Sequence, residues 1–195
     1  MFGQMQFGRE FFASLERLEE EITLRVAAAN CAVCGGPLHR SDYERKPRGG
    51  LIAPEGESAV VRFSLCCGRE GCRKRATPPS LRFLGRRVYL GVVVIVASIV
   101  AQALATQKET RRATGVPGKT VRRWLGWWRG PFLRTEAFVT ICALLNGVAV
   151  SQIPASIGAK LKGSPEERVR TLLRLLAPLT TSSVRDGSRY LGVVS

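Results

Sequence analysis

Residues 90–101 read Leu-Gly-Val-Val-Val-Ile-Val-Ala-Ser-Ile-Val-Ala and lie within a run, residues 88–107, that carries no charged side chain. About twenty apolar residues are enough to cross a lipid bilayer, so a transmembrane helix is the first structure to consider. Gly91, Ser98 and Gln102 interrupt the apolar character. A membrane span here would also separate the cysteines before it from the basic motif after it. Because we expect these two regions to act together, we interpret the run as a helix buried in the protein core.

The net charge of the chain, +15 at pH 7, is unevenly distributed. Residues 31–130 hold nineteen basic and six acidic residues, whereas residues 1–30 hold three basic and five acidic ones. Such an excess of positive charge attracts phosphate-rich partners, and the cations repel one another when no partner is bound. The sequence therefore predicts a polyanion-binding surface and places it in the middle of the chain.

Residues 9–28 show the spacing of an amphipathic helix, with apolar residues every three or four positions. The apolar stripe consists of Phe11, Leu15, Leu18, Ile22 and Val26. Such a helix either covers the core or docks on a partner, and a transposase or a second copy of the chain is the partner we expect. The N-terminus lacks the basic-then-apolar pattern of a secretory signal, which predicts a cytoplasmic protein with reduced cysteines.

Five of the six cysteines lie between residues 31 and 72. Cys31 and Cys34 enclose two residues and are followed by two glycines, which let the backbone curl towards a metal ion. Cys67 and Cys72 enclose four residues, two of them glycines, and predict a second, longer turn. Two such pairs, separated by short β-like segments, are typical of tetrahedral zinc in a ribbon. Cys66 competes with Cys67 as the third ligand, and the spacing favours Cys67.

The predicted zinc ion is structural, because four thiolates leave no open coordination position. Residues 31–80 are short of apolar side chains, so metal binding would supply folding free energy that a core cannot. His39 is a less favoured substitute ligand, and reduced cysteines without a metal are the alternative interpretation. Cys142 lies on the apolar face of a later predicted helix and is expected in the core. The expected phosphate contacts near the zinc are Arg69, Arg73, Lys74, Arg75, Arg82, Arg86 and Arg87.

Residues 107–129 predict two helices joined by a tight turn. A short polar helix leads to Thr114, Gly115 supplies the backbone freedom of the turn, and a second helix begins at Pro117 or Gly118. The apolar positions of the second helix, three and four residues apart, are Val121, Trp124, Leu125 and Trp128. Its opposite face is basic, and the expected DNA contacts are Lys119, Thr120, Arg122 and Arg123.

This division of faces is what a DNA-recognition helix requires, with an apolar side against the domain and a cationic side in the major groove. Lysine and arginine there can contact either phosphates or guanine edges. A charged face that meets only solvent is the alternative interpretation.

The C-terminal part predicts two more helices. One spans residues 133–149, and the other starts at Ser164, where a capping serine, a proline and a glutamate coincide, and stops near Pro178. The predicted fold is mainly α, with a small N-terminal β zinc ribbon followed by a helical helix-turn-helix domain. Its expected divisions are an N-terminal amphipathic helix (1–30), the zinc ribbon (31–80), the helix-turn-helix region (81–130), C-terminal helices (131–180) and a tail (181–195).

Several segments carry a resemblance to known families. Thr114-Gly-Val, followed by Thr120-Val-Arg-Arg-Trp124, resembles the helix-turn-helix of transposases and other bacterial DNA-binding proteins. A zinc ribbon ending in Arg73-Lys-Arg-Ala-Thr-Pro-Pro-Ser80, an apolar helix and this motif resemble the DNA-binding front end of some insertion-sequence transposases. Over about residues 30–180, the chain resembles small uncharacterised bacterial proteins associated with insertion sequences; the segments that carry this are 82–90, 153–156 and 175–180. The resemblance implies DNA binding near mobile elements.

An enzyme is not expected. The usual strand-transfer core of a transposase holds two metal ions with three carboxylates, and the only aspartates here are Asp42 and Asp186. A single histidine excludes nucleases that need paired histidines. We expect an accessory or regulatory factor of a mobile element that binds double-stranded DNA and lacks a catalytic core. The alternatives are a small membrane protein with a basic cytoplasmic face and an RNA-binding zinc-ribbon protein.

Overall fold

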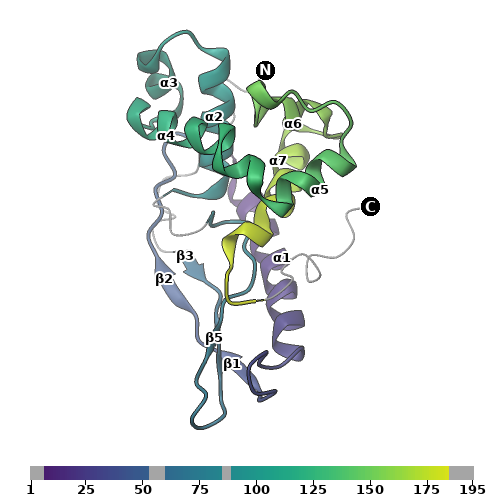
Figure 1. The fold of residues 1–195 in the computed structure, drawn as a ribbon. Coiled ribbons are helices and arrows are strands. Elements are labelled where there is room, and N and C mark those ends of the chain that lie inside the picture. Colours follow the sequence, from purple (N-terminus) through teal and green to yellow (C-terminus); the bar gives the residue numbers. More distant parts are fainter. Residues whose placement is uncertain (1–6, 53–59, 85–88, 185–195) are drawn as a thin grey trace.

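The computed structural model describes residues 7–52, 60–84 and 89–184, and it is mainly helical with a small amount of sheet. Figure 1 shows the helices that follow residue 90 gathered at one end, the strands at the other, and the first helix beside the strands. The α-helices are α1 (Arg9–Ala28), α2 (Gly91–Ala103), α3 (Gln107–Thr114), α4 (Gly118–Arg129), α5 (Glu136–Leu144), α6 (Ala155–Lys160) and α7 (Pro165–Leu176). Short 3-10 helices are η1 (Pro131–Arg134), η2 (Val150–Gln152) and η3 (Ala177–Thr180).

The strands are short and antiparallel. One sheet has the order β1-β4-β5, formed by Leu38–Arg40, Leu65–Cys67 and Arg75–Ala76, with Leu38 opposite Cys67 and Leu65 opposite Ala76. A second sheet pairs β2 (Tyr43–Arg45) with β3 (Val60–Arg62). Strands of two or three residues bury little apolar surface, so these sheets need another source of stability.

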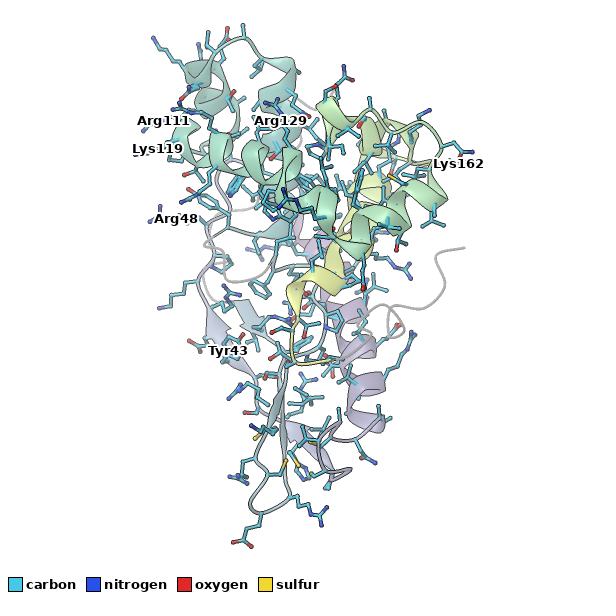
Figure 2. The ribbon with its side chains drawn as sticks, viewed as in Figure 1. Tyr43, Arg48, Arg111, Lys119, Arg129 and Lys162 are labelled. Carbon is cyan, nitrogen blue, oxygen red and sulfur yellow. The ribbon has the colours of Figure 1, made fainter. Side chains whose placement is uncertain are left out.

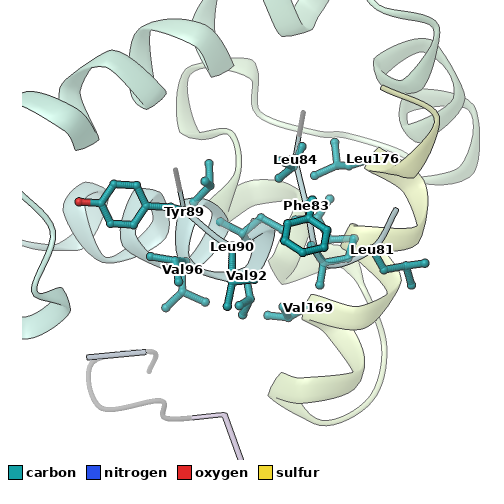
Figure 3. Close-up of a cluster of buried hydrophobic side chains, with 14 of the residues drawn as sticks. Leu81, Phe83, Leu84, Tyr89, Leu90, Val92, Val96, Val169 and Leu176 are labelled. Atoms are coloured by element: carbon teal, nitrogen blue, oxygen red, sulfur yellow. The ribbon is translucent and has the colours of Figure 1, made fainter. Parts of the chain in front are cut away.

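Helix α2 forms the centre of the core, as the charge-free run predicts. Every residue from Gly91 to Val100 is buried, and the helix packs against α3, α4, α6 and α7. Helix α2 spans thirteen residues and ends at Ala103, well before the end of the charge-free run, because Thr106 caps the start of α3. None of the helices in the described ranges has both the length and the apolarity to span a membrane. Figure 3 shows part of this core, where residues 81–84 and 89–96 pack against α7.

Helix α1 carries a buried carboxylate at the middle of its apolar face. The Glu19 side chain is 1 % exposed and accepts hydrogen bonds from the Ser80 hydroxyl and from the backbone N–H groups of Leu81 and Arg82, both at 2.7 Å. The Arg82 guanidinium binds Glu19 at 2.9 Å, Glu16 at 3.0 Å and the Val61 carbonyl at 3.0 Å. This network joins α1, the segment after β5 and the middle of β3.

The position of Arg82 corrects its expected role as a phosphate contact. Its side chain is 4 % exposed, and its guanidinium also lies over the rings of Phe63 and Phe83. A guanidinium held on all sides by carboxylates, a carbonyl and aromatic rings cannot reach a phosphate. The nearby Arg62 is buried too, and donates to the carbonyls of Phe63 and Pro78.

The predicted helix over residues 133–149 is wrong in extent. The chain forms η1, then α5 from Glu136 under a cap by Thr135, and the helix ends at Leu144. Only Ala137 and Ile141 of α5 are buried, so just a narrow edge of this helix faces the core. Cys142 is exposed rather than buried, because one residue along an α-helix turns the side chain by about 100°. The start of α7 is as predicted, since Ser164 and Glu167 form a reciprocal cap.

Removing the Glu19 charge tests this network. In Glu19→Gln, we expect the free energy of unfolding to fall by about 3 kcal/mol, because the buried Arg82 loses its counter-ion. Glu20→Gln is the matched control, because its partner Arg40 is 41 % exposed and such a pair contributes at most about 1 kcal/mol. Urea unfolding of both variants measures the difference, and equal losses would contradict the stabilising role of Glu19.

Candidate metal centre and nucleic-acid interface

The first cysteine turn follows the end of α1. The Cys31 N–H donates to the Gly36 carbonyl at 2.9 Å, and the Gly35 N–H donates to the Cys31 carbonyl at 2.8 Å, which closes the turn. Gly35 has a φ of +70°, in the left-handed region that glycine adopts without strain. A Cβ on Gly36 would lie 3.2 Å from the Cys67 sulfur and 3.3 Å from the Cys34 sulfur. The glycine pair therefore lets the backbone close around the sulfur atoms.

The second cysteine turn joins β4 to β5. Cys67 ends β4, its N–H donates to the Lys74 carbonyl at 2.9 Å, and the Cys72 N–H donates to the Arg69 carbonyl at 3.2 Å. The two turns are tied together, because the Gly68 N–H donates to the Pro37 carbonyl at 2.9 Å. The backbone thus fixes the positions of all four cysteines.

The sulfur atoms of Cys31, Cys34, Cys67 and Cys72 all lie within 4.8 Å of one another. The Cys31 and Cys72 sulfurs are 3.8 Å apart, and the Cys34 and Cys67 sulfurs are 3.5 Å apart. These distances are too long for disulfides, whose sulfurs are about 2.0 Å apart. Four thiolates at about 2.3 Å from a central ion form a tetrahedron with edges of about 3.8 Å. The cluster has the size and donor set to hold one metal ion.

The thiols of this cluster differ in pKa. The backbone N–H of Gly36 lowers the pKa of Cys34 to about 7, and the N–H groups of Val33 and Cys34 lower the pKa of Cys31. The N–H of Arg69 also lowers the pKa of Cys67, but burial and the neighbouring thiols outweigh it and raise that pKa to about 12. A metal ion that binds all four sulfurs would displace the remaining protons.

Cys66 and His39 lie outside the cluster. They are opposite each other in the pairing of β1 with β4, and the Cys66 sulfur lies 3.5 Å from the Arg73 carbonyl. Successive side chains of a strand point to opposite faces, so Cys66 faces away from the side that Cys67 occupies. Of this adjacent pair, the structure brings Cys67 to the other three sulfurs, in agreement with the spacing.

The basic residues near the cysteines differ in their hydrogen bonds within the protein. Arg73, Lys74 and Arg75 are all exposed, but Arg75 also donates to the Ser41 carbonyl and the Ser64 hydroxyl. Arg86 and Arg87 lie outside the described residues. The strand β5, which carries Arg75, lies at the opposite end of the molecule from α3 and α4 (Figure 1). The two predicted sets of phosphate contacts therefore do not form one continuous surface.

Helices α3 and α4 are joined by a three-residue turn. Thr106 and Glu109 cap the start of α3 reciprocally, and Gly115 ends it with a φ of +70°. The buried Thr114 hydroxyl donates to the Thr110 carbonyl at 2.8 Å and accepts from the Val116 N–H at 3.2 Å. Thr110 is buried too, and its hydroxyl donates to the Thr106 carbonyl at 3.1 Å, so both threonines fit inside this helix pair.

Helix α4 is fixed by one face and exposed on the other. Val121, Trp124 and Trp128 are buried, and the Trp128 indole donates to the Ser98 hydroxyl of α2 at 3.1 Å. Tyr89 packs edge-on against Trp124, with ring centroids 5.2 Å apart. The other face presents three exposed cations and a half-buried threonine, which are Lys119, Arg122, Arg123 and Thr120.

Two more exposed cations, Arg48 and Arg111, lie beside this face and are not among the predicted DNA contacts. Figure 2 shows Arg48 and Arg111 projecting from the same side of the molecule as Lys119. Arg111 could have been predicted as a DNA contact, because it lies in α3, the first helix of the pair. Arg48 precedes Lys119 by 71 positions, so no local pattern places them together.

Comparison with known proteins gives no further guide, because no family model, curated protein or solved structure matches the chain. The candidate site rests on two features of the chain itself. One is the cluster of four sulfurs, and the other is the set of exposed cations on a helix fixed in the core.

The adjacent cysteines provide a matched test of the metal centre. We expect the wild-type protein to bind one equivalent of Co²⁺ with the intense absorption of a tetrahedral thiolate complex. Cys67→Ser should lose this absorption, because it removes one of the four clustered sulfurs, whereas Cys66→Ser should keep it. Titration of the reduced proteins with Co²⁺ measures both. Loss in Cys66→Ser with retention in Cys67→Ser would contradict the assigned ligands.

Proposed function

We propose that this protein binds double-stranded DNA, with α3 and α4 acting as a helix-turn-helix and α4 lying in the major groove. The observation that carries the proposal is the division of α4 into an anchored face and a cationic face. Trp124 and Trp128 are buried against the core, while Lys119, Arg122 and Arg123 are exposed. A helix held in one orientation presents these cations at a fixed place, as base readout requires.

The charges around α4 favour a polyanion over an uncharged partner. Residues 107–129 hold seven lysines and arginines and one acid, Glu109, whose carboxylate accepts the hydrogen bonds of the Thr106 cap. Cations of this density repel one another unless phosphates lie nearby. Lys119, Arg122 and Arg123 are long enough to reach guanine edges or phosphates, and Thr120 can contact either.

The four clustered cysteines bind structural zinc in this proposal. The sulfur spacing matches the tetrahedron expected for Zn²⁺, and the donor set leaves no coordination position for a substrate. The strands around the cysteines are two or three residues long, so metal binding would stabilise a zinc ribbon that apolar burial cannot. The zinc ribbon then holds Arg73 and Lys74 at a second, separate place for phosphate contact.

The biological role we propose is that of an accessory or regulatory factor of a mobile element, acting by binding rather than by catalysis. The support is the resemblance of residues 30–180 to insertion-sequence-associated proteins, together with the basic face of α4. A transposase is the protein partner that this role implies.

The recognition helix is tested with a triple variant, Lys119→Ala/Arg122→Ala/Arg123→Ala. We expect the affinity for duplex DNA to fall by roughly a hundredfold, since each good contact of this kind contributes about 1 kcal/mol or more. The slope of log affinity against log salt should also fall by about 0.9 for each cation that contacts a phosphate. Fluorescence anisotropy at two salt concentrations measures both quantities.

The control is Lys160→Ala/Lys162→Ala, which removes exposed charge on and just after α6. It should bind duplex DNA nearly as the wild type does. Equal binding by the wild type and the triple variant would show that α4 is not the recognition helix. Tighter binding to structured RNA than to duplex DNA would favour an RNA-binding protein instead.

A further inference from the structure

We propose that Arg48 contacts the DNA backbone at the edge of the groove that α4 occupies. This inference rests on the proposed DNA binding by α3 and α4, and adds a contact from the part of the chain that carries the cysteines. Arg48 follows β2 in the chain and pairs with Tyr89, just before α2, so it belongs to neither helix of the pair.

The backbone of Arg48 is held against the segment that leads into α2. Arg48 forms a parallel bridge with Tyr89, and the Leu90 N–H donates to the Arg48 carbonyl at 3.4 Å. Pro47 beside it is buried, while the Arg48 side chain is exposed. Tyr89 also packs on Trp124 of α4, so Arg48 has a defined position relative to that helix.

The residues after Arg48 are fixed to the end of α3. The Leu51 N–H donates to the Thr114 carbonyl at 3.0 Å. Gly50 has a φ of +58°, and a Cβ there would lie 2.5 Å from the Thr114 carbonyl oxygen. A Cβ on Gly115 would in turn lie 3.2 Å from Leu51. This close contact between two glycines brings the segment against the turn between α3 and α4.

Arg48 is therefore one of three cations, from α3, α4 and the segment after β2, that share a side of the molecule. Figure 2 shows Arg48, Arg111 and Lys119 projecting in the same direction. Within the described ranges, the side chains of Arg48 and Lys119 have no ion-pair or hydrogen-bond partner in the protein, and both are exposed. Cations that flank a recognition helix without internal partners are suited to the phosphates that border the groove.

The contact is tested by measuring DNA binding of Arg48→Ala, Arg48→Lys and a control, Lys162→Ala, against the wild type. Lys162 is exposed and lies on the other side of the molecule in Figure 2. For Arg48→Ala, we expect a roughly fivefold loss of affinity, the contribution of one exposed ion pair. The salt slope should fall by about 0.9, and the loss should be similar on every duplex sequence. Arg48→Lys should keep the slope, because it keeps the charge.

The possible results separate this inference from the proposed function. If the wild type does not bind duplex DNA, both are overturned. If the wild type binds and Arg48→Ala behaves as Lys162→Ala does, only the Arg48 contact is overturned. A loss confined to duplexes with A·T-rich flanks would place Arg48 in the minor groove and would overturn the backbone contact.

Gly50→Ala provides a second test that leaves the charge unchanged. The added Cβ collides with the Thr114 carbonyl and strains the positive φ, so the segment must move away from α3. We expect a loss of DNA affinity similar to that of Arg48→Ala, with the Co²⁺ spectrum of the cysteine cluster retained. Unchanged affinity in Gly50→Ala would contradict the role of this close contact in positioning Arg48.

Discussion

The arrangement of the two ends of this protein depends on one buried carboxylate. Glu19 accepts hydrogen bonds from the backbone at residues 81 and 82 and pairs with the buried guanidinium of Arg82. Helix α1 starts beside α7, where Arg170 lies over the Phe11 ring, and it ends just before Cys31. A carboxylate in the middle of this helix therefore sets how the cysteine end is held against the helical end. Separating Glu19 from Arg82 would leave a buried charge without a counter-ion, so this pair opposes movement of α1 away from the segment after β5.

The two ends are stabilised by different chemistry. The helical end buries a nearly continuous apolar helix, α2, against α3, α4, α6 and α7. The strand end has strands too short to bury much surface, and a metal ion held by the four clustered sulfurs would compensate for that. The DNA-binding surface that we propose is built on the helical end, where Trp124 and Trp128 fix α4. In our proposal, the segment around Arg48 is the link between the two ends, because it follows β2 and contacts the turn between α3 and α4.

Features set by local pattern could be predicted from the sequence. The charge-free run gave a buried helix, the spacing of glycines around the cysteines gave the four clustered sulfurs, and helical periodicity gave the buried and exposed faces of α4. The helices and each cysteine turn depend on residues a few positions apart, whose relative placement follows from turn or helix geometry. That the two cysteine turns meet, across 33 and 41 positions, was predicted instead from the four ligands that tetrahedral zinc requires.

Features set by distant partners could not be predicted in this way. Charge counting groups Arg82 with the free cations, but its partner Glu19 lies 63 positions earlier. Arg48 meets α3 through the hydrogen bond from Leu51 to Thr114, across a comparable separation. Cys142 was predicted to be buried but is exposed. Periodicity shows which residues share a helix face, but not how many of them the core covers, and α5 buries only Ala137 and Ile141.

The most direct test of the account is methylation protection of guanine N7, an atom in the major groove. The duplex should be one selected from a random library by the wild-type protein. We predict a short block of protected guanines with the wild type, and loss of that protection with Lys119→Ala/Arg122→Ala/Arg123→Ala. A stable complex in which every guanine N7 remains reactive would contradict the placement of α4 in the major groove.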